Sequence, residues 1–229
     1  MKTIHALLRI ASLAAIAAAA PANATVLWDG SGANDSVSLT QFGASGTNVA
    51  SGTTFVSLSG ITGAVTSTSA GTLQRRDQSA GWDGNFASGA PVLWNLGTAG
   101  DITFTFDTAV SAVGAKFQTD IYGPFTARIL LSDNSFFDVA GVSNANGDDS
   151  AIFIGAQNAI ANITGITFHE QIGPGANNFA IGNLSLRLAG TGNGAVPEPA
   201  TWAMMLIGFA AVGSAMRRRK PHARVRFAF

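Results

Sequence analysis

Few segments of the chain combine side chains that can do chemistry, and the first joins an aromatic ring to hydrogen-bonding groups. Trp82 lies in the turn-like run 81–85, followed by Asp83 and, two residues later, by Asn85. An aromatic face stacks on the C–H surface of a sugar ring, and the two polar side chains can bond its hydroxyls. The alternative is that Trp82 packs in the core, where most tryptophans lie. An exposed Trp82 beside Asp83 and Asn85 would distinguish the two.

Other aromatic side chains offer the same chemistry. Trp94 lies within the apolar run Val92–Trp94, which favours core packing over ligand contact. Trp28 and Tyr122 are further candidates, with both interpretations open.

A run of side-chain oxygens gives the candidate metal site. Asn144, Asn146, Asp148 and Asp149 alternate along a polar loop, and hard cations such as calcium take oxygen ligands of this kind. The run lacks the glycine position and the terminal glutamate of an EF-hand loop. Asn, Gly and Asp are also common turn residues, so a calcium site and a plain turn both fit. No other cofactor is predicted.

A hydrolase would use His169 as its general base, because this is the only histidine within residues 25–199. Its neighbour Glu170 is expected on the opposite face of a strand, where it cannot pair with His169. The chain has no cysteine, no Gly-x-Ser-x-Gly elbow and no His-Glu-x-x-His motif. We therefore predict that the protein is not an enzyme. A hydrolase would need a distant aspartate against His169.

The elements that must hold these residues are strands. Within Ile102–Phe106, apolar and threonine residues alternate with the period of two that a half-buried strand requires. The run Phe179–Leu188 changes parity at Gly182–Asn183, which predicts a β-bulge. Residues 25–189 thus predict an all-β domain, an antiparallel β-sandwich or jelly roll, in which Ser36–Gly71 forms edge strands or long loops. Further strands are expected at Val113–Thr119, Ala127–Leu131, Ser135–Val139, Ala151–Gly155 and Ile163–Phe168.

Charge is distributed unevenly along a chain that is neutral as a whole. Residues 25–199 carry all thirteen acidic residues and only five of the thirteen Lys and Arg, a net charge of −8. An acidic domain with few cations argues against nucleic acid as a partner, because phosphate backbones are bound by Lys and Arg.

The N-terminal segment predicts a secretory signal peptide over residues 1–24. Lys2 and Arg9 give a positive start, and an Ala-rich apolar stretch follows over Ile10–Ala20. Ala22 and Ala24 then form a small-x-small cleavage site, with the mature chain beginning at Thr25. Ala20 and Ala22 form a second possible site.

The C-terminal segment combines a spacer, an apolar stretch and a block of cations. Residues 190–200 read as a Gly/Pro linker. Thr201–Met216 carries no charge, and a helix of this length spans about 24 Å, which predicts a short transmembrane anchor. The basic tail, residues 217–229, is expected in the cytoplasm and the acidic domain on the other side. The alternative is a buried core helix with a solvated tail.

This segment closely resembles the PEP-CTERM sorting signal in its Pro-Glu-Pro-x-x-Trp-Ala form. The resemblance rests on the spacer, the Trp-Ala start of the apolar stretch and the basic end. It implies a Gram-negative bacterium that makes exopolysaccharide or biofilm matrix. It also implies an exosortase as partner, cleavage near Pro197–Pro199, and delivery to the cell surface or matrix. The matching residues are Pro197, Glu198, Pro199, Trp202, Ala203, Arg217, Arg218, Arg219 and Lys220.

Three function classes follow. The favoured one is an exported structural or adhesive protein of the surface or extracellular matrix. The second is a carbohydrate-binding, lectin-like module for exopolysaccharide, centred on Trp82, Asp83 and Asn85. The third is the hydrolase that His169 would require.

Overall fold

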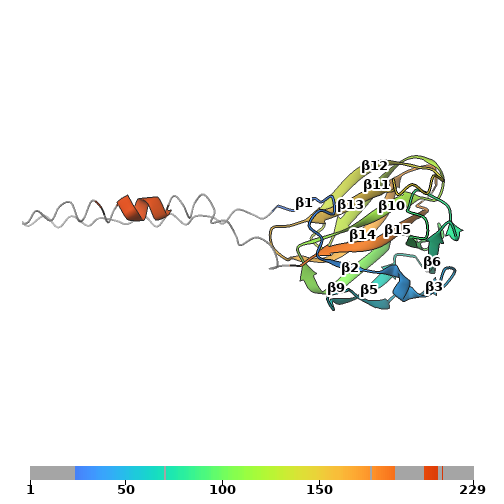
Figure 1. The fold of residues 1–229 in the computed structure, drawn as a ribbon, viewed down its shortest axis with the longest axis horizontal. Coiled ribbons are helices and arrows are strands. Elements are labelled where there is room, and N and C mark those ends of the chain that lie inside the picture. The colour runs from blue at the N-terminus through green and yellow to red at the C-terminus, as the bar shows by residue number, and fades with distance from the viewer. Residues whose placement is uncertain (1–23, 70, 176, 189–203, 211–212, 214–229) are drawn as a thin grey trace, which may run out of the picture. The chain divides into compact units, whose positions relative to one another are not determined.

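A computed structural model describes residues 24–69, 71–175, 177–188, 204–210 and 213. The chain divides into two compact units, residues 1–188 and 189–229. Within the first unit the described residues form fifteen strands in two sheets (Figure 1). This arrangement confirms the predicted antiparallel β-sandwich. The predicted signal peptide lies almost entirely in residues 1–23, outside the described residues.

The larger sheet has nine strands among the described residues. Its central path runs, in order, through β1 (Val26–Leu27), β13 (Ile152–Gln157), β10 (Ala112–Thr119), β15 (Phe179–Arg187), β8 (Pro91–Trp94), β6 (Leu73–Gln78) and β3 (Asn48–Val49), with β2 (Asp35–Val37) and β7 (Gly81–Trp82) beside it. Strand β2 pairs with β15, and β7 with β6. All pairings are antiparallel except that of β6 with β7.

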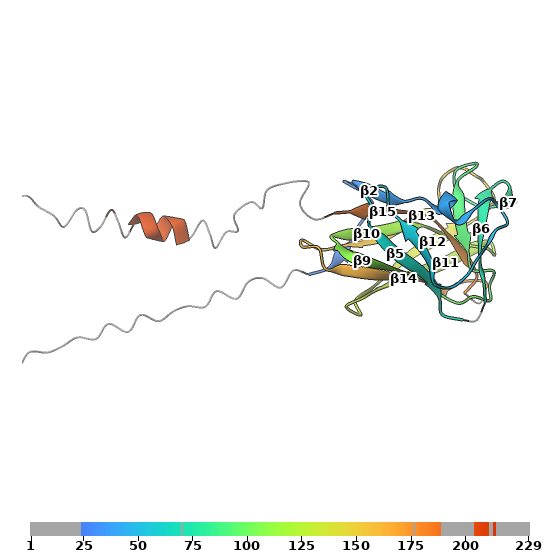
Figure 2. The same cartoon turned by 90° about the horizontal axis from the view of Figure 1, so that it is seen from below.

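The smaller sheet has six strands, all paired antiparallel. Figure 2 shows its strands packed as a second layer against the first sheet. Its order is β12 (Phe136–Ser143), β11 (Gly123–Leu131), β14 (Ile163–Ile172), β9 (Ile102–Val110), β5 (Thr62–Ser67) and β4 (Thr53–Val56).

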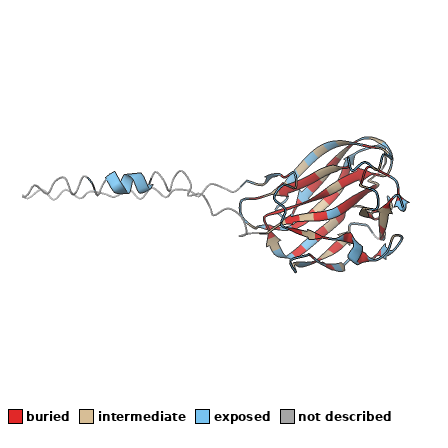
Figure 3. Ribbon diagram, in the orientation of Figure 1, coloured by how far each residue is buried: buried red, intermediate tan, exposed pale blue. Residues whose placement is uncertain are grey.

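The core lies between the two sheets, and period-two patterning determines which side chains enter it. In β9, Ile102, Phe104 and Phe106 are buried, as the alternation predicts. Figure 3 shows the same alternation of buried and exposed positions along the long strands. Phe117 of β10 stacks on Phe179 of β15 with ring centroids 4.6 Å apart. Burying aromatic surface of this kind is the main source of stability in a chain without disulfides.

The predicted bulge in β15 is present. Between the register pairs Ala115–Leu184 and Phe117–Ile181, β15 has one residue more than β10. The extra residue lets Leu184 return to the core, while Asn183 is exposed and its Oδ1 accepts a hydrogen bond from the Leu39 N–H at 2.8 Å. That bond holds the 3₁₀ turn Leu39–Phe42 against the sheet.

The segment Ser36–Gly71 contains more sheet structure than its sequence indicates. It supplies the edge strands β3 and β4, as predicted, but also β5, which lies between β9 and β4 inside the smaller sheet. Because β5 contains small residues, its sequence does not show the apolar–polar alternation that predicts a strand. Gly63 of β5 is one example, because a Cβ there would lie 2.0 Å from the Thr105 carbonyl oxygen.

In the second unit, residues 204–210 and 213 are helical and their side chains are exposed. No helix among the described residues is long and apolar enough to cross a membrane. The rest of the predicted span, the linker and the tail of residues 217–229 lie outside the described residues. The transmembrane helix therefore stays a prediction.

Candidate ligand-binding site

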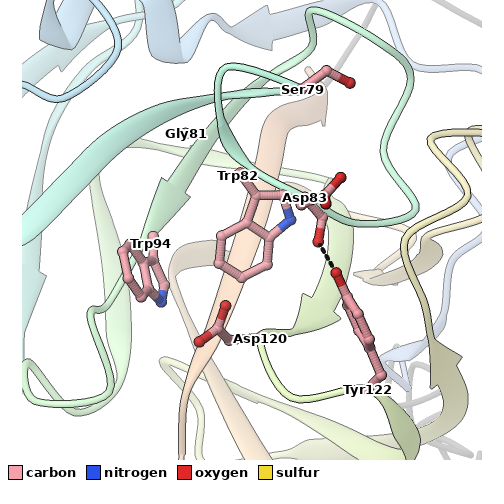
Figure 4. Close-up of a pocket in the computed structure, with 7 residues that line it drawn as sticks. All are labelled: Ser79, Gly81, Trp82, Asp83, Trp94, Asp120 and Tyr122. Atoms are coloured by element: carbon pink, nitrogen blue, oxygen red, sulfur yellow. Dashed lines mark hydrogen bonds between the residues drawn. The ribbon is translucent and has the colours of Figure 1, made fainter.

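One end of the sandwich carries an open depression of about 530 Å³, a size typical of sites for small molecules. Three aromatic side chains and two carboxylates line it (Figure 4). Trp82 ends β7 and Asp83 follows it, Trp94 ends β8, and Asp120 and Tyr122 lie in the segment that follows β10. The lining residues are Ser79, Gly81, Trp82, Asp83, Trp94, Asp120 and Tyr122.

A tight turn between β6 and β7 places Trp82 and Asp83. The Ser79 N–H donates to the Trp82 carbonyl at 2.7 Å, which closes the turn. Gly81 has a φ of +107°, a conformation that favours glycine, and a Cβ there would lie 2.7 Å from Nη1 of Arg76. The turn therefore needs glycine at the position before Trp82.

Trp82 forms the floor of the depression rather than an exposed platform. Its side chain is only 4% exposed and contacts Trp94 edge-on, with ring centroids 5.7 Å apart. Trp82 thus packs in the core, the alternative that the sequence offers, and the exposed Trp82 that would distinguish a sugar-stacking platform is not observed. Its indole N–H, however, is buried and has no hydrogen-bond partner among the described residues. A polar group in that state is rare in native structures.

Trp94 lies half-buried beside Trp82 and is held from both sides. Its indole N–H donates to Oδ1 of Asn178 at 2.7 Å. The guanidinium of Arg76 lies 5.9 Å from the centroid of its ring. Its apolar neighbours in the sequence favour core packing over ligand contact. In the structure, Trp94 lines the depression as well.

Asn178 joins the aromatic and acidic parts of the site. Its Nδ2 donates to Oδ2 of Asp120 at 2.9 Å, while its Oδ1 accepts from Trp94. Its own N–H donates to Oε2 of the buried Glu170 at 2.8 Å. Neither Asp120 nor Asn178 is identified by sequence patterns, because they lie 58 residues apart and only the sheet pairing brings them together.

Tyr122 is the most open aromatic ring of the site, 48% exposed. Its hydroxyl donates to the carbonyl oxygen of Asp83 at 2.9 Å, which ties the two sides of the depression together. Partial burial raises the pKa of Tyr122, and the negative charges of Asp83 and Asp120 raise this pKa further. The phenol therefore stays neutral and keeps its donor.

Asn85, the third predicted ligand residue, is buried at 1% exposure and stands apart from the lining. Its Nδ2 donates to Oδ1 of Asn144 at 2.9 Å and to Oγ of Ser150 at 2.7 Å. Its Oδ1 accepts from the Asn144 N–H at 2.7 Å. The amide of Asn85 is thus engaged within the protein, where it fixes the loop that follows β12.

In the candidate metal loop, Asn144–Asp149, side-chain oxygens accept hydrogen bonds that close turns of the backbone. Oδ1 of Asn144 accepts from the Asn146 N–H at 2.8 Å, and Asp148 accepts from Ser150, which lowers the pKa of Asp148. Asp149 forms an ion pair with Lys116 at 2.5 Å. Among the described residues, no three or more His, Asp and Glu side chains lie together as a metal site requires. Hydrogen bonds and an ion pair close the loop as a turn, and the calcium site stays a prediction.

His169 and Glu170 point in opposite directions from β14. Glu170 is 4% exposed, whereas the side chain of His169 is 31% exposed and its Nδ1 lies 2.7 Å from Oδ1 of Asp101. A carboxylate thus does contact His169, which the hydrolase interpretation requires. Asp101 also accepts from Nδ2 of Asn177 at 2.8 Å. Neither His169 nor Asp101 lines the depression.

Comparison with known families identifies one segment. Residues 195–220 match the model of the PEP-CTERM protein-sorting motif, as the resemblance predicts. No curated protein and no solved structure matches the chain. The motif is an exosortase recognition signal. It marks the chain for export, for membrane anchoring before cleavage and for sorting towards the cell surface.

Proposed function

We propose that this exported protein is a non-enzymatic, adhesive component of the extracellular matrix that binds exopolysaccharide in the depression around Trp82. The observation that carries the proposal is that two aromatic rings and two carboxylates, from Trp94, Tyr122, Asp83 and Asp120, meet at one open depression. The buried ring of Trp82 supports them from below.

The side chains that line the depression are of types that bind a sugar ring. Tyr122 and Trp94 present aromatic surface for the C–H face of the ring, and the carboxylates of Asp83 and Asp120 accept hydrogen bonds from hydroxyls. The His169–Asp101 pair does not line the depression, so His169 is not placed to act as a general base on a ligand there. This favours binding over the hydrolysis that His169 would carry out.

The charge of the lining narrows the class of carbohydrate. Asp83 and Asp120 both bring negative charge, and none of the described lining residues is Lys or Arg. Like charges repel, so a uronate-rich polymer would lose affinity here, whereas a neutral or amino-bearing sugar would not. We therefore propose neutral or amino sugars as the ligands.

Isothermal titration of the full chain in mild detergent tests the proposal. The probes are a cello-oligosaccharide, a chitosan oligosaccharide and an oligogalacturonate. We expect the first or second to bind and the third not to bind. Loss of stacking in Tyr122→Ala should weaken binding about three- to tenfold. Asp120→Asn should reduce any preference for the amino sugar, since only the charge of Asp83 then remains in the lining.

Ile121→Ala is the matched control, because Ile121 is 46% exposed next to Tyr122 but does not line the depression. Its affinity should equal that of the unchanged chain. Failure of all three probes to bind, or equal affinities for the Tyr122→Ala variant and the control, would contradict the proposal and favour a purely structural matrix protein.

A further inference from the structure

Strand β12 is a long sheet edge, and no strand among the described residues pairs with its outer side. It ends the order of the smaller sheet and runs for eight residues, whereas the edge strands β1, β3 and β4 have two, two and four. Figure 1 shows β12 at the border of the domain. A long edge presents a row of unpaired N–H and C=O groups, and natural proteins usually blunt it.

None of the usual protections is present on β12. Its sequence, Phe136–Ser143, contains no Pro and no Lys, and its pairing with β11 runs through eight consecutive residue pairs without a register shift. Its only charged residue, Asp138, is bound by Arg128 through two hydrogen bonds of 2.7 Å. Phe136 and Val142 are 55% and 61% exposed. The edge has no bulge, exposes two large apolar side chains, and carries one charge, which is paired.

The register with β11 shows which backbone groups face outward. The Leu131 N–H donates to the Ser135 carbonyl at 2.9 Å, so this pair is hydrogen-bonded, and in an antiparallel ladder such pairs alternate. The backbone N–H and C=O groups of residues 137, 139, 141 and 143 therefore face β11. Those of Phe136, Asp138, Ala140 and Val142 face the open edge.

We propose that β12 pairs with β12 of a second copy of this chain, antiparallel and with the two-fold axis at Val139. Opposed residues in such a pair must lie on the same face of the sheet, so the axis must pass through a residue rather than between two residues. An axis at Val139 places Phe136 opposite Val142 of the second copy and Asp138 opposite Ala140. The outward-facing groups of both copies then form eight hydrogen bonds.

Neighbouring registers are less favourable. An axis at Asp138 would place two carboxylates directly opposite each other, which destabilises a strand pair. An axis at Ala140 would place Asp138 opposite the exposed Val142 and leave Phe136 without an apolar partner. The Val139 register alone pairs the two exposed apolar side chains of β12, and Leu130 of β11 lies beside Phe136 to extend the apolar contact.

Because the chain has no cysteine, single cysteines report this register in the full chain in mild detergent. Opposed residues without mutual hydrogen bonds lie about 4.5 Å apart at Cα, within disulfide range. Val139→Cys should therefore form a homodimer on mild oxidation. Phe136→Cys and Val142→Cys should cross-link when mixed, and neither alone. Val56→Cys, on the opposite edge strand, is the control and should stay monomeric.

Sedimentation velocity provides a test without cross-linking. Val142→Lys places a cation on the open edge, near Arg128 and Phe136 of the second copy, and should weaken association at least tenfold. Val56→Lys makes the same change on β4, where Val56 is 53% exposed, and should leave association unchanged. A monomeric unchanged chain, equal effects of the two lysines, or Val139→Cys cross-linking no better than Val56→Cys would overturn the proposal. None of these readouts depends on a carbohydrate.

Discussion

Asn178 is the residue on which the geometry of the depression depends, since its amide holds Trp94 and Asp120 at the same time. A third bond, from its N–H to Glu170, ties this amide to the end of β14. Side chains with several partners of this kind position others without needing to contact the ligand.

We predict that Asn178→Ala loosens both Trp94 and Asp120. Losing two side-chain hydrogen bonds should lower the free energy of unfolding by roughly 1–3 kcal/mol, measured by urea denaturation. Carbohydrate affinity should fall as well. Asn146→Ala, an amide change in an exposed loop, should alter neither quantity by a comparable amount. Equal effects of the two substitutions would show that Asn178 does not hold the site.

Trp82→Phe distinguishes the contribution of the indole N–H from that of the aromatic ring. The variant keeps the edge-on contact with Trp94 but removes a buried donor that has no partner, so the fold should persist. Because the N–H is buried and not exposed in the depression, the loss of affinity in titration calorimetry should be smaller than that of Tyr122→Ala. A loss equal to that of Tyr122→Ala would show that the ligand reaches the indole N–H.

Of the three residues that the sequence predicts as a ligand site, Trp82 and Asp83 line the depression and Asn85 does not. That these residues bind a ligand stays a prediction. Asn85 lies only two residues after Asp83 and is therefore predicted with it, yet its side-chain amide donates hydrogen bonds to Asn144 and Ser150. Local sequence cannot show this, because those partners lie 59 and 65 residues away.

At the scale of elements, the end of β14 and the loop that follows it depend on a buried carboxyl group. Burial raises the pKa of Glu170 above its ordinary value of 4.5, although the N–H of Asn178 opposes this. The folded chain therefore holds this proton more tightly than the unfolded chain. The contribution of Glu170 to stability is complete below pH 4.5 and is lost as the pH rises through the raised pKa.

Glu170→Gln should remove that part of the pH dependence. The amide keeps an oxygen for the Asn178 N–H but cannot ionise, so the variant should gain stability relative to the unchanged chain as pH rises from 4 to 8. Urea denaturation across this range measures the difference. Two parallel stability curves would contradict the assignment.

The core strands are the elements that the sequence predicts best. Alternation in β9 and the change of parity in β15 both have direct counterparts in the sheet. Strand β5 escapes prediction because neighbouring positions on both of its faces carry small residues, Gly63 and Ala64, that give no contrast in hydropathy. Its place between β9 and β4 depends on non-local pairing that no local pattern encodes.

Phe117→Ala tests the packing between sheets. Phe117 is fully buried and stacks on Phe179 at 4.6 Å. Its removal leaves a cavity and should lower the free energy of unfolding by about 3–5 kcal/mol in urea denaturation. Phe136→Ala, at an exposed position on β12, should cost far less in a monomer. Similar losses for both would contradict the assigned core.

At the scale of the whole molecule, sorting depends on the C-terminal segment. Residues 195–220 match the sorting motif, and the motif ends in the cations Arg217–Lys220. A cationic block keeps its side of a membrane segment in the cytoplasm. Deleting Arg217–Lys220 should therefore leave the protein misoriented or secreted uncleaved, as judged by mass and cell fractionation. A mature form of unchanged mass and location would count against this role.

If the chain pairs through β12, each dimer has two copies of the depression that we propose as a carbohydrate site. Two linked sites bind a repeating polymer more tightly than one, because the second contact is intramolecular. Val142→Lys should then weaken binding to long polysaccharide while leaving affinity for a short oligosaccharide unchanged.

The indole signals of the four tryptophans, observed in a ¹H–¹⁵N spectrum of the full chain, test the central claim most directly. Trp28 is an internal control, since its N–H donates to the Ser31 carbonyl at 2.8 Å. Titration with the cello- or chitosan oligosaccharide should shift the signals of Trp82 and Trp94 and leave that of Trp28 in place. A spectrum that both oligosaccharides leave unchanged, or a shift confined to Trp28, would contradict a carbohydrate site in this depression.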